Sequence, residues 1–203
     1  LIDTFQTFLH NLPFYGLAVL CSDDLVIRDL RPHIRRPVVT YGVEAGADYR
    51  ATQIRQDGTR MQFEVALMGE RRIEVDLPIP GFHNVRNALA AIAVADKVGI
   101  AADAITEGLR SFAGIDRRFE ILGEMILSPG QALLVDDYAH HPREIEATLA
   151  AAQGCWPDRR KVVVFQPHRF TRTQELLDDF SALLGGEACL VITEVYAAGE
   201  KPI

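Results

Sequence analysis

The sequence has little cysteine and no long apolar segment. Its 203 residues include three cysteines, Cys21, Cys155 and Cys189, which lie far apart. This spacing predicts free thiols rather than disulfides or a zinc site, and it favours a reducing compartment such as the cytoplasm. No apolar run reaches the roughly 18 residues that a membrane helix needs. The first residues have no basic segment followed by an apolar core, so they do not predict a secretion signal. We therefore expect a cytoplasmic protein without membrane insertion.

Several motifs of common enzyme classes are also missing. The sequence contains no Gly-x-x-x-x-Gly-Lys-Ser/Thr phosphate loop, no Gly-x-Gly-x-x-Gly turn after a strand and no Gly-x-Ser-x-Gly elbow. The net charge of -7 gives no support to a nucleic-acid surface, which needs a basic excess. We expect no nucleic-acid partner and assign no metal ligand, and the sequence leaves the oligomeric state open.

The composition predicts a packed α/β protein, because 48% of the residues are apolar and 24% are charged. The first part of the chain alternates between helix and strand patterns, with helices expected at residues 2–11 and 23–30 and strands at 16–21 and 38–41. Ser22 or Asp23 is expected to cap the second helix. Two strands joined by a helix predict a parallel pair.

An antiparallel pattern follows. Strands are expected at residues 49–54 and 59–67 around a turn at 56–58, and a further turn at 68–70 leads to a strand at 72–77. Two helices then follow, at residues 84–98, where Asn84 is a possible cap, and 102–112, where Ile105, Leu109 and Phe112 share one face. The first unit is therefore predicted to hold a mixed sheet with an antiparallel meander.

The strand–helix alternation returns after a linker at residues 113–119. Strands are expected at 132–135, 161–165 and 188–193, and helices at 142–152 and 174–184, which together predict an open parallel sheet. We place the domains at residues 1–117 and 118–203. The chain starts within a helical pattern and stops soon after a strand, so we expect it to be part of a longer protein.

Residues 136–142, here called the acid–imidazole loop, have the sequence Asp-Asp-Tyr-Ala-His-His-Pro. The loop lies between a predicted strand and a predicted helix, where open parallel sheets bind ligands. The start of the helix adds free N–H groups that favour an anion. The alternative is that Asp136 and Asp137 cap the helix and the two histidines are ordinary surface residues.

Residues 166–173, here called the arginine loop, have the sequence Gln-Pro-His-Arg-Phe-Thr-Arg-Thr after the next predicted strand. Arg169 and Arg172 can converge on one carboxylate or phosphate. The alternative is a solvated helix start capped by Thr173, although arginines at a helix N-terminus oppose the helix dipole. Since the two loops follow consecutive strands, we expect both to open onto the same edge of one sheet.

Two shorter motifs add polar groups. His83, Asn84 and Asn87 lie at a helix start, and the two carboxamides could recognise a nucleobase edge or simply complete the helix cap. Arg117 and Arg118 lie in the linker, where they could reach phosphates or form an exposed basic segment.

Together, these segments resemble the Mur ligases of peptidoglycan assembly. The resemblance rests on residues 83–91, 116–119 and 136–142, and the arginine loop narrows it to the member that attaches L-alanine to UDP-N-acetylmuramate. Residues 11–16 and 194–200 fit the same member. The resemblance implies a central ATP-binding domain, incomplete here and without its phosphate loop, followed by a Rossmann-like carboxy-terminal domain. It also implies a reaction that uses ATP and Mg²⁺ to form an acyl phosphate, which the alanine amine then attacks.

The resemblance further implies roles for individual residues. The nucleotide would be contacted by His83, Asn84, Asn87, Arg117, Arg118 and Asp137. The alanine would be contacted by Tyr138, His140, Arg169 and Arg172, with the arginines paired to its carboxylate. The catalytic residues would be His140, Arg169, Arg172 and Asp137, with His140 as the candidate base that removes the amine proton.

Two other functions remain open from the sequence. A recycling ligase that adds a preformed peptide to the same sugar would share the acid–imidazole loop, but a peptide needs a roomier site than two arginines suggest. A binding module could keep the fold without catalysis. Because the phosphate loop is absent, we expect that these residues alone do not turn over substrate.

Overall fold

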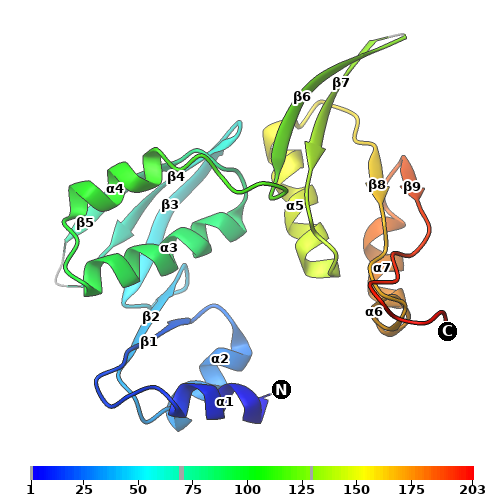
Figure 1. The fold of residues 1–203 in the computed structure, drawn as a ribbon. Helices are drawn as coiled ribbons and strands as arrows, with labels where there is room; N and C mark the ends of the chain where they lie inside the picture. Colours follow the sequence, from blue (N-terminus) through cyan, green and yellow to red (C-terminus); the bar gives the residue numbers. More distant parts are fainter. Residues whose placement is uncertain (1, 69–70, 129) are drawn as a thin grey trace. The chain divides into compact units, whose positions relative to one another are not determined.

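The computed structural model describes residues 2–68, 71–128 and 130–203, and the chain divides into two compact units, residues 1–113 and 114–203 (Figure 1). The predicted domain boundary between residues 117 and 118 stays a prediction. In the described ranges, no helix is both long enough and apolar enough to cross a membrane.

The first unit contains a mixed sheet of five strands in the order β1-β2-β3-β4-β5. The strands are β1 (Ala18–Cys21), β2 (Val38–Gly42), β3 (Tyr49–Asp57), β4 (Arg60–Ala66) and β5 (Arg72–Leu77). β1 and β2 are parallel, as the strand–helix–strand pattern predicted, and β3, β4 and β5 form the predicted antiparallel meander. The turn predicted at residues 68–70 falls partly on Gly69 and Glu70, which lie outside the described residues.

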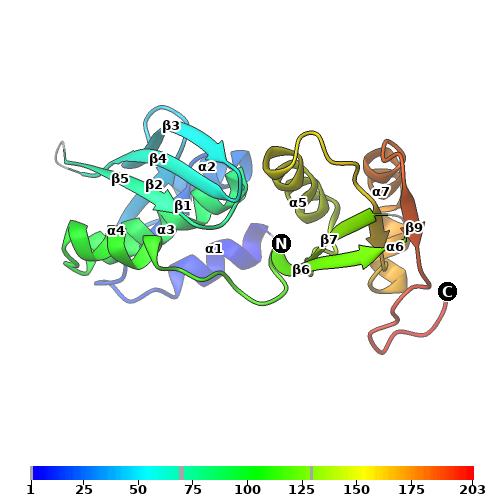
Figure 2. The same cartoon turned by 90° about the horizontal axis from the view of Figure 1, so that it is seen from above.

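The main core of this unit lies between the sheet and two helices, α3 (Phe82–Lys97) and α4 (Ala102–Arg110), which cover one face of the sheet (Figure 2). Strand residues such as Phe63 and Val75 pack with Leu89, Ile92 and Ile105 of the helices. Alternation along the strands brings these apolar side chains to one face. Helices α1 (Ile2–His10) and α2 (Leu25–Leu30) lie at the β1 end, and a short 3-10 helix, η1 (Arg31–His33), follows α2.

Three sequence-based details of this unit are wrong. Asp24, rather than Ser22 or Asp23, caps α2, with its side chain accepting a hydrogen bond from the Ile27 N–H. Asn84 does not cap α3, because the helix begins one turn earlier with Gly81 at the cap position. Phe112 lies beyond the end of α4 and is 38% exposed, so it does not continue the buried face of that helix.

The second unit contains two small sheets. β6 (Glu120–Leu127) and β7 (Gly130–Asp136) form an antiparallel hairpin, while β8 (Val163–Phe165) and β9 (Leu190–Ile192) are parallel. The helices are α5 (Pro142–Cys155), α6 (Phe170–Glu175) and α7 (Leu177–Leu184). Ile145 of α5, Phe165 of β8 and Phe180 of α7 form one core cluster.

The structure corrects three predictions for this unit. The strand predicted at residues 132–135 pairs with β6, which the sequence did not predict, and belongs to a different sheet from β8. Gly123 and Glu124 interrupt the apolar pattern of β6, and Gly123 has a positive φ of 117° beside a register shift. The helix predicted at 174–184 is split at Leu176, whose φ and ψ are -113° and 20°. Its first part starts at Phe170, so Thr173 is not a cap.

Candidate functional site

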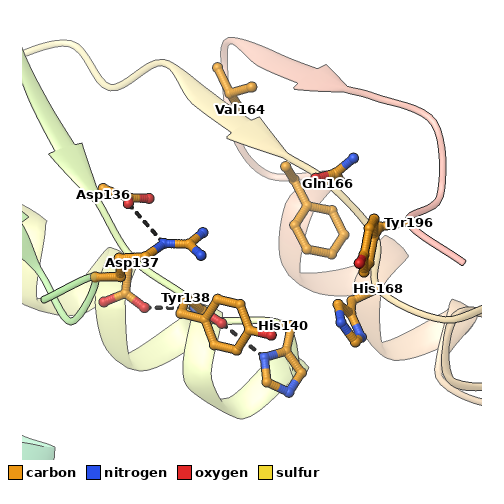
Figure 3. A pocket seen from close by; sticks show the side chains of 11 residues that line it. Asp136, Asp137, Tyr138, His140, Val164, Gln166, His168 and Tyr196 are labelled. Atoms are coloured by element: carbon orange, nitrogen blue, oxygen red, sulfur yellow. Dashed lines mark hydrogen bonds and ion pairs between the residues drawn. The ribbon is translucent and has the colours of Figure 1, made fainter. Parts of the chain in front are cut away.

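The acid–imidazole loop and the arginine loop line the same pocket of about 450 Å³ in the second unit (Figure 3). The acid–imidazole loop follows β7, and the arginine loop follows β8, so the pocket lies where the two strands end. The expectation that the loops lie together is confirmed, but the expectation of one shared sheet is wrong. A core cluster formed by α5, β8 and α7, rather than a shared sheet, supports the two loops.

Asp137 anchors the acid–imidazole loop to the preceding linker. One carboxylate oxygen accepts a hydrogen bond from the Phe119 N–H at 2.8 Å, and the other accepts one from the Ala139 N–H at 2.8 Å. Phe119 is itself buried and stacks on Trp156 with ring centroids 5.9 Å apart. Both oxygens of Asp137 therefore already accept hydrogen bonds from the backbone. This indicates that the side chain fixes the conformation of the loop that lines the pocket.

Arg117 brings a cation to the pocket wall. Its Nε donates to Asp136 Oδ2 at 3.1 Å, and its guanidinium carbon lies 4.8 Å from the centre of the Tyr138 ring. The Tyr138 N–H donates to the Arg117 carbonyl at 2.8 Å. Arg117 adopts a positive φ of 57°. Because the Arg117 and Asp136 side chains are 58% and 38% exposed, this ion pair can open for an anionic ligand at small cost.

Four rings form a continuous wall of the pocket. The centroids of Tyr138 and His140 are 5.1 Å apart, those of His140 and His168 are 5.4 Å apart, and those of His168 and Tyr196 are 5.3 Å apart. Tyr196 reaches this wall from the segment after β9, where its N–H donates to the Pro167 carbonyl at 2.8 Å. The wall therefore combines flat apolar surfaces with imidazole nitrogens that can exchange protons.

Glu144, in the first turn of α5, fixes the backbone beneath His140. Its Oε2 accepts hydrogen bonds from the N–H groups of His140 at 3.0 Å and His141 at 3.1 Å, and the His141 side chain caps the helix in return. The alternative in which Asp136 and Asp137 cap this helix is therefore wrong. Burial raises the pKa of the Glu144 carboxyl, but these hydrogen bonds, together with the charges of His140 and Arg118, hold it below its usual value.

His168 lies between the two loops and the arginines. Partial burial lowers the pKa of His168. The positive charges of Arg172, Arg169 and His140, the last only in its protonated form, lower it further, while Glu200 acts in the opposite direction. The imidazole is therefore neutral near pH 7.

The structure brings together only part of the predicted site. Of the residues predicted to contact alanine or nucleotide, the pocket lining includes Arg117, Asp137, Tyr138 and His140. Arg169 and Arg172 are not among the lining residues, although Arg172 Nη1 lies 3.4 Å from His168 Nδ1. Arg118 lies 3.6 Å from Glu144. The sequence analysis did not select His168, Gln166 or Tyr196 as site residues. His168 and Gln166 belong to the arginine loop, so their position beside Arg169 was the signal that could have identified them.

The predicted adenine-binding residues lie in the first unit, at the start of α3. The Asn84 carboxamide is occupied, because its Nδ2 donates to the Pro80 carbonyl at 2.7 Å and its Oδ1 accepts from Asn87 Nδ2 at 3.2 Å. Asn87 is exposed and His83 is half-buried. The Asn87 carboxamide is therefore the more accessible of the two, and Asn84 holds it in position.

Comparison with protein families identifies the class of the protein. The Mur ligase middle domain matches residues 1–95, and the Mur ligase glutamate ligase domain matches residues 117–202. The chain therefore belongs to the Mur ligase family, which confirms the resemblance and the α/β fold class.

Individual relatives indicate which members of the family the chain resembles. The chain is 56% identical to UDP-N-acetylmuramate--L-alanine ligase of Halorhodospira halophila over 97% of its own length, and it spans 40% of that relative. The solved structure of UDP-N-acetylmuramate-alanine ligase MurC from Thermotoga maritima has a TM-score of 0.75 at 31% identity, with 96% of this chain and 41% of that chain covered. A murein peptide ligase from Psychrobacter arcticus has a TM-score of 0.63 at 25% identity, with 95% of this chain and 47% of that chain covered.

Proposed function

We propose that this chain supplies the amino-acid site of an ATP-dependent ligase that joins L-alanine to UDP-N-acetylmuramate in peptidoglycan precursor synthesis. The observation that carries the proposal is that the acid–imidazole loop and the arginine loop line one and the same pocket. The 56% identity to a ligase of that name supports the same substrate pair.

His140 has the geometry of the base that takes the amine proton. Its Nδ1 lies 2.8 Å from the Tyr138 carbonyl oxygen, which can only accept a hydrogen bond, so Nδ1 carries the ring proton. Nε2 is then left with its lone pair. An alanine ammonium bound next to it loses a proton to Nε2, and the resulting neutral amine can attack an activated carboxyl group.

The surroundings of the pocket favour the carboxylate of the amino acid. Arg172 Nη1 lies 3.4 Å from Nδ1 of His168, which lines the pocket, and Arg169 is the next residue in the chain, so two cations adjoin the pocket wall. Arg117, which is held over Tyr138, adds a cation that can approach phosphate oxygens. These charges would also stabilise the tetrahedral intermediate that forms when the amine attacks.

We assign nucleotide contacts to Asn87 and His83, with Asn84 in support, and to Arg117 and Arg118 for the phosphates. The accessible Asn87 carboxamide suits the edge of an adenine. When bound, ATP with magnesium would supply the phosphoryl group that activates the muramoyl carboxylate. Within residues 2–68, 71–128 and 130–203 no group of three or more His, Cys, Asp or Glu side chains could hold a metal ion, and we assign no metal ligand in the chain.

The proposal can be tested with a chimera in which these residues replace the matching part of the Halorhodospira halophila relative. We expect phosphate release that requires ATP, UDP-N-acetylmuramate and L-alanine together. The chain by itself should release no phosphate above background, since its sequence contains no phosphate loop. A chimera that folds but remains inactive with L-alanine would contradict the proposal.

The same assay separates the alternatives. A recycling ligase would react faster with a tripeptide than with L-alanine, and the peptide ligase from Psychrobacter arcticus provides a positive control for that reaction. A binding module without catalysis would give no product with either acceptor.

A further inference from the structure

The segments that follow β8 and β9 remain paired beyond the ends of the two strands. The Tyr196 N–H donates to the Pro167 carbonyl, and the Arg169 N–H donates to the Tyr196 carbonyl, each at 2.8 Å. These bonds continue the parallel register of β8 and β9, with His168 paired to Tyr196. The segment after β9 thereby brings the Tyr196 ring to the pocket wall beside His168 (Figure 3).

Each of the two paired segments contains a strained residue. Arg169 has a φ of 72° and Ala198 has a φ of 49°, values that residues other than glycine rarely adopt. The Arg169 carbonyl accepts hydrogen bonds from the Thr173 N–H at 3.1 Å and the Thr173 hydroxyl at 2.7 Å. Ala198 lies in a turn that the Glu200 N–H closes by donating to the Ala197 carbonyl at 2.9 Å. Strained conformations of this kind persist only where the surrounding contacts determine them.

The Glu200 carboxylate joins the two segments at their far end. Its Oε1 accepts a hydrogen bond from the Thr171 hydroxyl at 2.7 Å, and its Oε2 accepts one from the Thr171 N–H at 3.0 Å. The hydrogen bonds from Thr171 hold the pKa of the Glu200 carboxyl below its usual value, so the group is charged at neutral pH. Tyr196 and Glu200 therefore hold the arginine loop on both sides of the strained Arg169.

We propose that Glu200 is a positioning residue for the amino-acid site, because its contact with Thr171 keeps Tyr196 in the pocket wall and Arg169 in its strained conformation. The inference rests on the proposed function, since it concerns how the pocket assigned to the amino acid keeps its shape. Glu200 is not among the lining residues, so it acts through the segment after β9 rather than by touching the substrate.

The contact between Glu200 and Thr171 can be removed from either side. Glu200→Ala deletes the carboxylate, and Thr171→Val deletes the hydroxyl but keeps a side chain of similar size. Two conservative variants preserve the contact. Thr171→Ser retains the hydroxyl, and Glu200→Gln offers an oxygen to the N–H and an NH₂ group to the hydroxyl oxygen. Because Glu200→Gln also removes the charge, it separates the hydrogen bonds from the attraction between Glu200 and Arg169.

NMR spectra of the 203-residue chain provide the first measurement. Glu200→Ala should weaken the nuclear Overhauser contacts between the rings of Tyr196 and His168, and the Arg169 amide should exchange about fivefold faster, as for the loss of one hydrogen bond. Glu200→Gln should preserve both properties. Glu194→Ala is the matched control, since Glu194 is exposed in the same segment and only its backbone carbonyl takes part in the contacts of the described residues. Ring contacts that persist in Glu200→Ala would overturn the inference.

Kinetics of the chimera test whether the contact serves the amino acid. Glu200→Ala and Thr171→Val should raise the KM for L-alanine about threefold or more and leave the KM for ATP within about twofold. Thr171→Ser, Glu200→Gln and Glu194→Ala should keep both constants near those of the unsubstituted chimera.

Three kinetic results would refute the assignment. An unchanged KM for L-alanine in Glu200→Ala, or an equal rise in the KM for ATP, would show that the contact only stabilises the fold. An equal effect of Glu200→Gln and Glu200→Ala would show that the charge acts rather than the hydrogen bonds. An inactive unsubstituted chimera would contradict the proposed function, and the spectra of the chain would then decide the inference by themselves.

Discussion

Asp137 provides the sharpest test of how the pocket is built, because its two carboxylate oxygens accept hydrogen bonds from the backbone N–H groups of Phe119 and Ala139. Asp137→Asn keeps one oxygen acceptor but places an NH₂ group against either the Phe119 N–H or the Ala139 N–H. One charge-assisted hydrogen bond, worth about 1.5–3 kcal/mol, is then lost, and two donors face each other. Because Asp137 is half-buried, water can relieve part of this cost, and we expect a loss of about 2 kcal/mol.

Native-state amide hydrogen exchange is the suitable assay, because it reports each unit of the chain separately. The Phe119 and Ala139 amides should exchange about 30-fold faster in Asp137→Asn, which is the factor that corresponds to about 2 kcal/mol. Amides of β3 and β4 in the first unit should keep their protection.

Asp136→Asn is the matched control, since it makes the same chemical change one residue earlier. Asp136 pairs with the half-exposed Arg117, and such a surface pair contributes about 0–1 kcal/mol. Exchange at Phe119 and Ala139 should therefore change little in this variant. Unchanged exchange in Asp137→Asn would show that the carboxylate does not anchor the loop and is free for a ligand, as the sequence-based nucleotide role requires.

Three further predictions concern stability. Tyr49→Phe removes a buried 2.6 Å hydrogen bond to a carboxylate on α3 and should lower the free energy of unfolding by about 1.5–3 kcal/mol. Burial and that bond raise the pKa of Tyr49, so its contribution is present below its ordinary pKa of 10.0 and is lost as the pH rises above it, which urea unfolding at neutral and high pH would detect. Gly42→Ala would push a methyl group into the Asp23 carboxylate and cost about 1–3 kcal/mol, whereas Gly108→Ala, with open space in α4, should stabilise by about 0.5–1 kcal/mol in the same denaturation assay. Since the pKa of Glu144 is held below its ordinary 4.5, its contribution is present at neutral pH and lost as the pH falls below that value, and Glu144→Gln should remove this acid dependence of unfolding.

Strong apolar periodicity made much of the first unit predictable. Ile73, Val75 and Leu77 alternate with charged residues in the sequence, and all three side chains are buried in β5. The short apolar run before Cys21 likewise forms β1 beside its parallel partner. In these segments local pattern and tertiary packing favour the same structure.

The errors arose where local pattern and tertiary structure disagree. β6 has Gly123 at a positive φ and several exposed apolar side chains, such as Ile126 at 84%, so it lacks the alternation of a half-buried strand. The break at Leu176 has no glycine or proline to mark it. Backbone geometry of this kind is set by packing rather than by residue type.

The site was predictable as two loops but not as a set of contacts. The residue types of the loops indicated their chemistry. Both loops line one pocket, as expected, but the strands before them belong to two sheets rather than to the one sheet on which that expectation was based. The sequence could not show that the Asp137 oxygens are used by N–H groups of residues 119 and 139, one of them 18 positions away. Nor could it show that Tyr196, from the segment after β9, completes the wall beside His168.

The central claim is that His140 in this pocket contacts the amino acid rather than the nucleotide, and the KM values of a single variant test it most directly. His140→Gln in the chimera should raise the KM for L-alanine about tenfold or lower the rate of amide formation, because it alters the acceptor that we propose for the amine proton. The KM for ATP should stay within about twofold, a difference of roughly 0.4 kcal/mol. A large rise in the KM for ATP with unchanged alanine kinetics would contradict the account.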